Sequence, residues 1–94
     1  MLEKDVEKYF RMRVKNSGGW AMKFVSPGIS GVPDRLVLYP GGQMYFVELK
    51  RPGQKMRALQ RKIQRLIEKF GFTVYTISSK AEVDDFIWEV TGNE

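Results

Sequence analysis

Two strand-like runs on either side of a tight turn constrain the fold of this chain more than any other feature. The runs are Arg35 to Tyr39 and Gln43 to Leu49, rich in Val, Leu, Tyr and Phe, and Pro40-Gly41-Gly42 separates them. Adjacent glycines supply the positive φ angles that hairpin turns require. We therefore expect the two runs to pair as a β-hairpin.

Acidic and basic residues stand at the open end of this hairpin. Asp34 precedes the first run, and Glu48 and Lys50 lie at the end of the second. Because side chains alternate between the two faces of a strand, Glu48 and Lys50 point to the same face. Pairing of the strands brings Asp34 to the same end, so three chemically useful groups are expected to share one patch.

The two carboxylates of this patch predict a metal site. Carboxylates a few ångströms apart repel each other, and burial raises the cost, unless a cation neutralises them. The chain has no His and no Cys, and ligation by oxygen alone selects a hard ion such as Mg²⁺ or Mn²⁺ over zinc. Such an ion activates a water and stabilises charge on a phosphate under in-line attack. Lys50 would hold or help to deprotonate that water, or neutralise the pentavalent intermediate.

The first helix offers a third acid. Apolar residues recur at helical spacing from Leu2 to Val14, and Asn16 to Gly19 ends the pattern, which predicts an amphipathic helix over residues 2–15. Glu3 falls inside the apolar stripe and Glu7 at its edge. Two interpretations of Glu3 stand at this point: the helix dipole favours an acid in the first turn, or Glu3 belongs to the metal cluster.

A basic helix is expected after the hairpin, from about Gln54 to Phe70, with an apolar stripe on one side. Eight basic residues and one acid lie between Lys50 and Lys69. Such a block favours a polyanion through counterion release, although it also suits an ordinary solvated helix face. Gln60 lies between the basic and the apolar side, where a glutamine is usually an inert surface residue.

The remaining elements complete an α/β order. Trp20 to Val25 and Thr73 to Ile77 read as strands, and Ser79 to Glu82 matches a capping box that opens a last helix. The order is helix, three strands, helix, strand, helix. Because a helix joins the third and fourth strands, these two should pair in parallel, which predicts a mixed central sheet flanked by helices.

The motif residues resemble a known nuclease family. Pro33-Asp34 with Glu48-Leu49-Lys50 is similar to the motif of the PD-(D/E)XK nuclease superfamily. Gly31 to Arg35, Phe46 to Lys50 and then Gln60 look closest to the virus-type replication-repair nuclease family, VRR-NUC, whose small stand-alone members occur in phages and bacteria. The resemblance covers nearly the whole chain, and the order αβββαβα also resembles the restriction-endonuclease-like core of the superfamily.

The resemblance implies a set of site residues. A first-helix glutamate lies near the metal in the superfamily, and Glu3 is its match here, with Glu7 as the alternate. The metal ligands would then be Glu3, Asp34, Glu48 and the backbone carbonyl of Leu49, around Mg²⁺ or Mn²⁺. A glutamine of the second helix lies near the catalytic lysine in the family, so Gln60 is expected to orient water or contact substrate.

DNA is the expected partner of this site. Seven residues around it are candidate DNA contacts: Lys23, Ser26, Arg35, Arg51, Lys55, Arg57 and Arg61. The net charge of +5 suits a polyanion. Stand-alone relatives resemble homodimers that cut four-way junctions, and two symmetric sites suit a two-fold branched substrate.

Residues 1–94 are expected to form a single nuclease domain. No apolar run is long enough to span a membrane and no signal peptide pattern begins at Met1, so a cytoplasmic location in a bacterium, or in one infected by a phage, is expected. The leading interpretation is a metal-dependent, junction-cutting endonuclease. The alternatives are a nuclease directed to flaps or nicks, a binding module without catalysis, and a subunit whose acidic cluster docks a basic partner.

Overall fold

Within residues 3–92, three helices and four strands follow one another in the predicted order. The computed structural model describes residues 3–92 of the chain, with side chains from residue 4 onward. The elements are α1 (Glu3–Asn16), β1 (Trp20–Lys23), β2 (Arg35–Tyr39), β3 (Gln43–Leu49), α2 (Ala58–Lys69), β4 (Val74–Ile77) and α3 (Lys80–Thr91). The α/β architecture with order αβββαβα is thus confirmed. The predicted start of the first helix at Leu2 lies outside the described residues.

The four strands form one mixed sheet in the order β1-β2-β3-β4. β1 pairs with β2 and β2 with β3 in antiparallel fashion, whereas β3 and β4 are parallel. The hairpin of β2 and β3 closes through the pair Tyr39 and Gln43, and Gly41 and Gly42 take φ angles of 90° and 77° in its turn. These two glycines adopt the conformation for which the sequence selects them.

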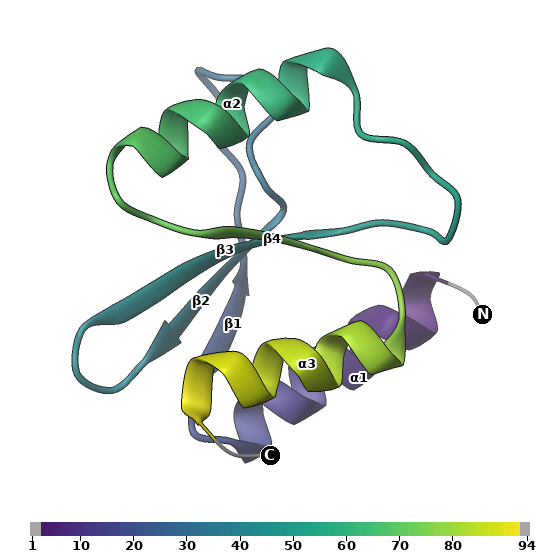
Figure 1. Ribbon diagram of the computed structural model, residues 1–94, viewed down its shortest axis with the longest axis vertical. Helices are drawn as coiled ribbons and strands as arrows, with labels where there is room; N and C mark the ends of the chain where they lie inside the picture. Colours follow the sequence, from purple (N-terminus) through teal and green to yellow (C-terminus); the bar gives the residue numbers. More distant parts are fainter. Residues whose placement is uncertain (1–2, 93–94) are drawn as a thin grey trace.

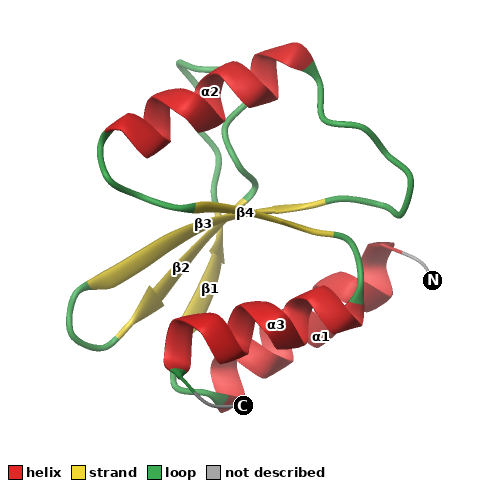
Figure 2. Cartoon of the chain, in the orientation of Figure 1, coloured by secondary structure: helices red, strands yellow, loops and turns green. Residues whose placement is uncertain are grey.

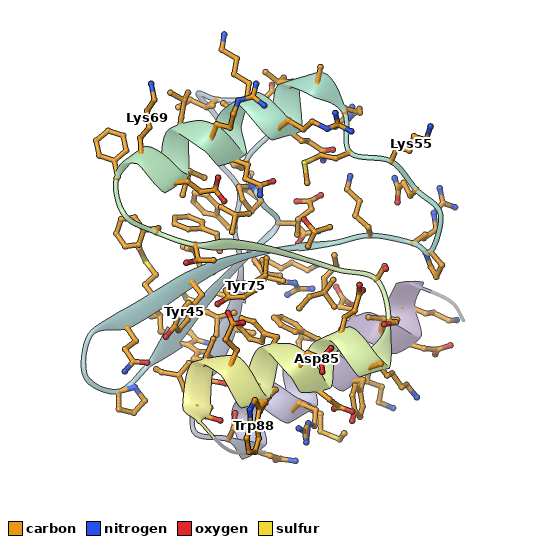
Figure 3. All side chains as sticks on the ribbon, viewed as in Figure 1. Tyr45, Lys55, Lys69, Tyr75, Asp85 and Trp88 are labelled. Carbon is orange, nitrogen blue, oxygen red and sulfur yellow. The ribbon has the colours of Figure 1, made fainter. Side chains whose placement is uncertain are left out.

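Helices cover both faces of the sheet (Figure 1). α1 and α3 lie side by side on one face and α2 lies alone on the other. The main core is between the sheet and the α1/α3 layer, and the following apolar side chains are buried there: Val6, Phe10, Val14, Val37, Tyr39, Val47, Leu49, Ile77, Val83, Phe86 and Ile87. Tyr45 and Tyr75 extend this core, both edge-on to the Phe86 ring (Figure 3).

The second helix begins four residues later than the sequence predicts. Gln54 accepts the backbone N–H of Arg51 and so closes a turn, and Arg57 has extended backbone angles as the residue before the first turn of α2. The Gln60 side chain then accepts the N–H of Arg57, which satisfies one of the donors left over at a helix start. Local side-chain bonds therefore hold residues 51–57 out of the helix.

The apolar stripe of α2 is less buried than expected. No residue of α2 is fully buried, and Leu59 and Leu66 remain 47% and 43% exposed. The stripe packs partly against the loop between β1 and β2, which rises beside α2 (Figure 2). The layer on this face is thin because, within residues 3–92, α2 is the only helix that covers it.

Smaller differences lie at the ends of elements. β1 ends at Lys23, after which the Phe24 N–H still donates to the Asp34 carbonyl across the sheet. Ser79 caps α3 by accepting the Glu82 N–H, as expected, but the Glu82 carboxylate accepts the N–H and hydroxyl of Ser78 instead of closing a capping box on Ser79. Of the helices within residues 3–92, none is long and apolar enough to cross a bilayer.

Gly31 joins the loop before Asp34 to α2, and its replacement should loosen this contact. It has a φ of 87°, and an added Cβ would come within 3.0 Å of Leu59 Cγ, whereas Gly53 has a φ of 81° and open space around it. Gly53→Ala is expected to cost about 1–2 kcal/mol for the left-handed conformation alone. Gly31→Ala should cost at least about 1 kcal/mol more through crowding, measured as the free energy of unfolding in urea. Equal costs for the two variants would contradict the close contact with α2.

Candidate active site

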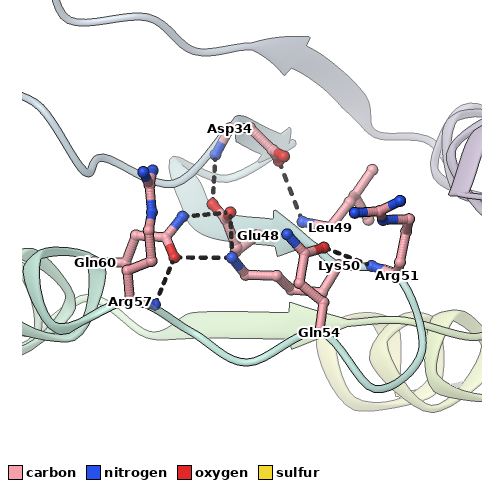
Figure 4. A network of polar contacts seen from close by, with 8 residues as sticks. All are labelled: Asp34, Glu48, Leu49, Lys50, Arg51, Gln54, Arg57 and Gln60. Carbon is pink, nitrogen blue, oxygen red and sulfur yellow. Dashed lines mark hydrogen bonds and ion pairs between the residues drawn. The ribbon is translucent and has the colours of Figure 1, made fainter.

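Asp34 and Glu48 meet where β2 begins and β3 ends. Antiparallel pairing of these strands places the residue before Arg35 next to the last residues of β3. The Asp34 N–H donates to Glu48 Oε1 at 3.1 Å, and the Leu49 N–H donates to Asp34 Oδ1 at 3.3 Å (Figure 4). Each carboxylate is therefore fixed by a backbone donor of the other strand, and the two acids share one site as the sequence predicts.

Lys50 lies beside Glu48 in a nearly dry environment. Glu48 is 8% and Lys50 5% exposed, and Lys50 Nζ is 3.5 Å from Glu48 Oε2. Buried charges are costly unless each has a partner and further hydrogen bonds. Keeping this pair out of water therefore requires additional partners, and Gln60 supplies them.

Gln60 connects α2 to both charged residues. Its Oε1 accepts Lys50 Nζ at 2.8 Å and the Arg57 N–H at 3.0 Å, and its Nε2 donates to Glu48 Oε2 at 3.1 Å (Figure 4). Both ends of the amide are thus engaged in the site. The interpretation of Gln60 as an inert surface glutamine is wrong, because its side chain orients the lysine and the glutamate together.

Arg35 and Glu7 form a second ion pair next to the first. Arg35 is 4% exposed, and one nitrogen of its guanidinium contacts Glu7 Oε2 of α1. Arg35 follows Asp34 directly but points to the opposite face of the sheet, toward α1. The expected role of Arg35 in DNA binding therefore needs correction, since its side chain is turned inward and already paired.

Two open pockets flank Asp34. One, of about 350 Å³, is lined by Lys4, Glu7, Asp34 and Leu49. The other, of about 280 Å³, has six lining residues: Glu7, Lys23, Phe24, Val25, Asp34 and Arg35. Glu7 and Asp34 line both, so Asp34 is reachable from solvent on the side where α1 begins.

The donor set at Asp34 and Glu48 fits a hard divalent ion. Two carboxylates lie together, partly buried, and the chain offers no nitrogen or sulfur ligand from His or Cys. Within residues 4–92 no group of three acids comes close enough to enclose an ion. The side chain of Glu3, the predicted third acid, lies outside the described residues, and the alternate, Glu7, borders the site but is paired with Arg35.

The remaining predicted DNA contacts lie around this site with different exposure. Lys23, Arg51, Lys55, Arg57 and Arg61 are exposed, whereas Ser26 is half-buried in the loop between β1 and β2. Lys55 extends outward from the loop before α2 (Figure 3). Of the exposed cations, Arg61 lies on α2, and Arg51, Lys55 and Arg57 lie in the loop that leads to it.

The Arg35–Glu7 pair is not among the contacts predicted from the sequence. A signal for it is present: Arg35 has the same parity in β2 as Val37 and Tyr39, which are buried under the α1/α3 layer. A charged residue at a core-facing position needs a partner. Glu7, at the edge of the apolar stripe of α1, lies close enough to Arg35 to be that partner.

Comparisons with known proteins found relatives that match most of this chain. A protein named "Putative nuclease p44" from Acyrthosiphon pisum secondary endosymbiont phage 1 is 42% identical over 78 residues, which cover 83% of this chain and 84% of that protein. A solved structure described as a VRR_NUC domain superposes with a TM-score of 0.84 at 35% identity, over 90% of this chain and 92% of the other. A scan against family profiles found no match. The close fold and the sequence identity along most of both chains show that the chain belongs to the VRR-NUC family.

Proposed function

We propose that this protein is a metal-dependent DNA endonuclease that hydrolyses phosphodiester bonds. The observation that carries the proposal is the arrangement of Asp34, Glu48 and Lys50, in which two carboxylates and a buried ammonium converge and Gln60 closes the network. Membership of the VRR-NUC family and the name of the phage relative support a nuclease.

The residues of the site would have different roles in the reaction. Asp34, Glu48 and the Leu49 carbonyl would hold Mg²⁺ or Mn²⁺, with Glu3 as the first-helix acid. When bound, such an ion supplies a Lewis acid for the phosphate and lowers the pKa of a coordinated water. Lys50, oriented by Gln60 at 2.8 Å, would donate to the attacking water or to the phosphate oxygens as negative charge builds up on them.

DNA would be held by the exposed cations of α2 and its preceding loop. Arg51, Lys55, Arg57 and Arg61 are exposed and follow the buried Lys50 in the chain. Contacts of this kind bind phosphates without regard to sequence and place the backbone over the acids. Lys23 and Ser26 would contact the strand on the other side of Asp34.

Arg61→Ala should weaken DNA binding without changing the fold. Loss of one phosphate contact is expected to raise Kd several-fold and to reduce the slope of log K against log salt by about 1. The matched control is Arg11→Ala, an exposed arginine of α1 on the opposite side of the sheet. Fluorescence anisotropy over a salt series measures both quantities, and equal slopes for the two variants would rule out a DNA contact at Arg61.

A branched substrate and a homodimer are part of the proposal. Large apolar side chains are exposed on several elements, among them Trp20 at 63% and Trp88 at 60%. Trp88 points away from the sheet on α3 (Figure 3). Aromatic side chains of this size anchor subunit contacts, and a two-fold dimer would present two sites to a two-fold junction. The proposal also includes a cytoplasmic location, where DNA and Mg²⁺ are both present.

Cleavage of a matched substrate set tests the specificity. A four-way junction, a flap, a nicked duplex and a plain duplex of the same sequence are incubated with protein and Mg²⁺, and the protein mass in solution is measured in parallel. We expect a dimer that cuts the junction by paired incisions. A monomer that cuts the flap or the nick equally well would replace junction resolution by the flap-directed or nick-directed activity.

The second candidate is a nucleic-acid-binding module. The basic surface of α2 favours it, because that surface attracts a polyanion whether or not Asp34 and Glu48 act in catalysis. This candidate predicts salt-sensitive DNA binding, no cleavage with any divalent ion, and no effect of such ions beyond screening.

A further inference from the structure

The ion pair between Glu7 and Arg35 has a consequence for the number of metal ions in the site. Glu7 lines both pockets that open beside Asp34, and its side chain is 33% exposed. A carboxylate in this position is available in principle as a ligand for a second cation next to Asp34. The Arg35 guanidinium contacts that carboxylate, and Arg35 itself is only 4% exposed.

Buried cations lie beside two of the acids around the site. Of its three described carboxylates, Glu48 has Lys50 as its buried partner and Glu7 has Arg35. Two of these three carboxylates are therefore each paired with a buried cation before any metal binds. Lys4 and Lys23, which line the two pockets, add further positive charge at the rim.

An arginine side chain is well suited to act as a permanent counter-ion for Glu7. The guanidinium carries a delocalised charge and a rigid fork of N–H donors that matches a carboxylate, so it holds Glu7 in a fixed arrangement. Because Arg35 is buried, salt screens the pair little. A second divalent ion at Glu7 would have to approach a carboxylate already neutralised, next to a first ion that repels it.

We propose that Arg35 is a built-in counter-ion that reserves Glu7, so that each chain takes one divalent ion, at Asp34 and Glu48, instead of two. The inference rests on the proposed function, because it concerns the metal of that site. It assigns Arg35 as a positioning residue, and it places Glu7 outside the ligands. It also favours Glu3 over Glu7 as the first-helix acid.

Binding of Mn²⁺ to the DNA-free protein tests the inference without any measurement of cleavage. Electron paramagnetic resonance counts bound ions per chain and detects coupling between neighbouring ions, and calorimetry gives their Kd. For the wild type we expect one uncoupled Mn²⁺ per chain, and Asp34→Asn should lose it. Glu7→Gln should change Kd by less than about threefold, whereas loss of a ligand or of its supporting partner typically costs about 10–100-fold.

Variants at Arg35 give the decisive contrast. Arg35→Met keeps an apolar stem of similar length but frees the Glu7 charge, so a second, weaker Mn²⁺ should bind. Arg35→Lys keeps the charge and should bind one Mn²⁺ ion per chain. The double variant of Arg35→Met with Glu7→Gln should return to one Mn²⁺ ion per chain. A purely structural salt bridge would change stability in these variants but leave the count at one throughout.

Each outcome separates the inference from the function on which it rests. Two coupled Mn²⁺ ions in the wild type, a tenfold or greater loss of affinity in Glu7→Gln, or a single ion in folded Arg35→Met would overturn the role of Arg35 and leave the nuclease proposal standing. Absence of any Mn²⁺ binding in the wild type would instead contradict the metal-dependent nuclease itself. If Arg35→Met does not fold, Glu7→Gln and the count in the wild type still decide the matter.

Discussion

Lys50→Ala is expected to lower the rate of DNA cleavage by about 10³-fold while the affinity for DNA stays within a few-fold of the wild type. The Lys50 ammonium is 5% exposed, 2.8 Å from Gln60 Oε1 and 3.5 Å from Glu48 Oε2. A positive charge held in so dry a place stabilises developing negative charge far more than an exposed lysine does. Single-turnover cleavage of a labelled junction measures the rate, and anisotropy in Ca²⁺ measures binding.

Lys55→Ala is the matched control for this variant. Lys55 belongs to the same connection between β3 and α2 but is exposed, so its loss should weaken binding slightly and leave the single-turnover rate unchanged. Because Lys50→Ala also leaves Glu48 without its cation, the thermal midpoint of each variant is recorded. Cleavage by folded Lys50→Ala at the wild-type rate would remove Lys50 from the chemistry.

Gln60→Leu should reduce cleavage by about 10²-fold, the effect typical of a group that orients a catalytic residue. Leucine has a similar volume but ends three hydrogen bonds, to Lys50, to Glu48 and to the Arg57 N–H. The first two losses free the charged residues to move. The third removes a helix-start bond, so a loss of about 1 kcal/mol in the free energy of unfolding is expected as well.

Gln64→Leu separates catalysis from helix stability in this comparison. Gln64 lies one turn further along α2, and among the described residues its side chain bonds only to Glu68, at 3.4 Å. The same substitution there should leave both the cleavage rate and DNA binding unchanged. If Gln64→Leu slows cleavage as much as Gln60→Leu, the effect is due to α2 as a whole and not to the contacts of Gln60.

The sequence alone predicts the hairpin and the acids at its end because both depend on local rules. Strand alternation puts Glu48 and Lys50 on one face, and the glycine turn brings Asp34 beside them. The order of helices and strands likewise follows from periodicity. The mixed sheet follows because a helix joins two neighbouring strands.

Other features depend on contacts between distant residues, which local patterns do not carry. The delayed start of α2 follows from bonds of Gln54 and Gln60 to the preceding backbone, which compete with helix formation. The partial exposure of α2 follows from how little of the sheet it covers. Arg35 looked like a DNA contact because it is basic and near Asp34, but strand parity turns it inward to Glu7.

Metal-dependent cleavage is tested most directly by single-turnover incubation of the wild-type protein with a labelled four-way junction in Mg²⁺, in Mn²⁺ and in EDTA. Lys50→Ala, purified identically, is the control for contaminating nucleases. We expect cutting with either metal, none in EDTA, and none above background in the variant. Salt-sensitive binding by the wild type without cutting under any of the three conditions would contradict this expectation and identify the protein as a binding module.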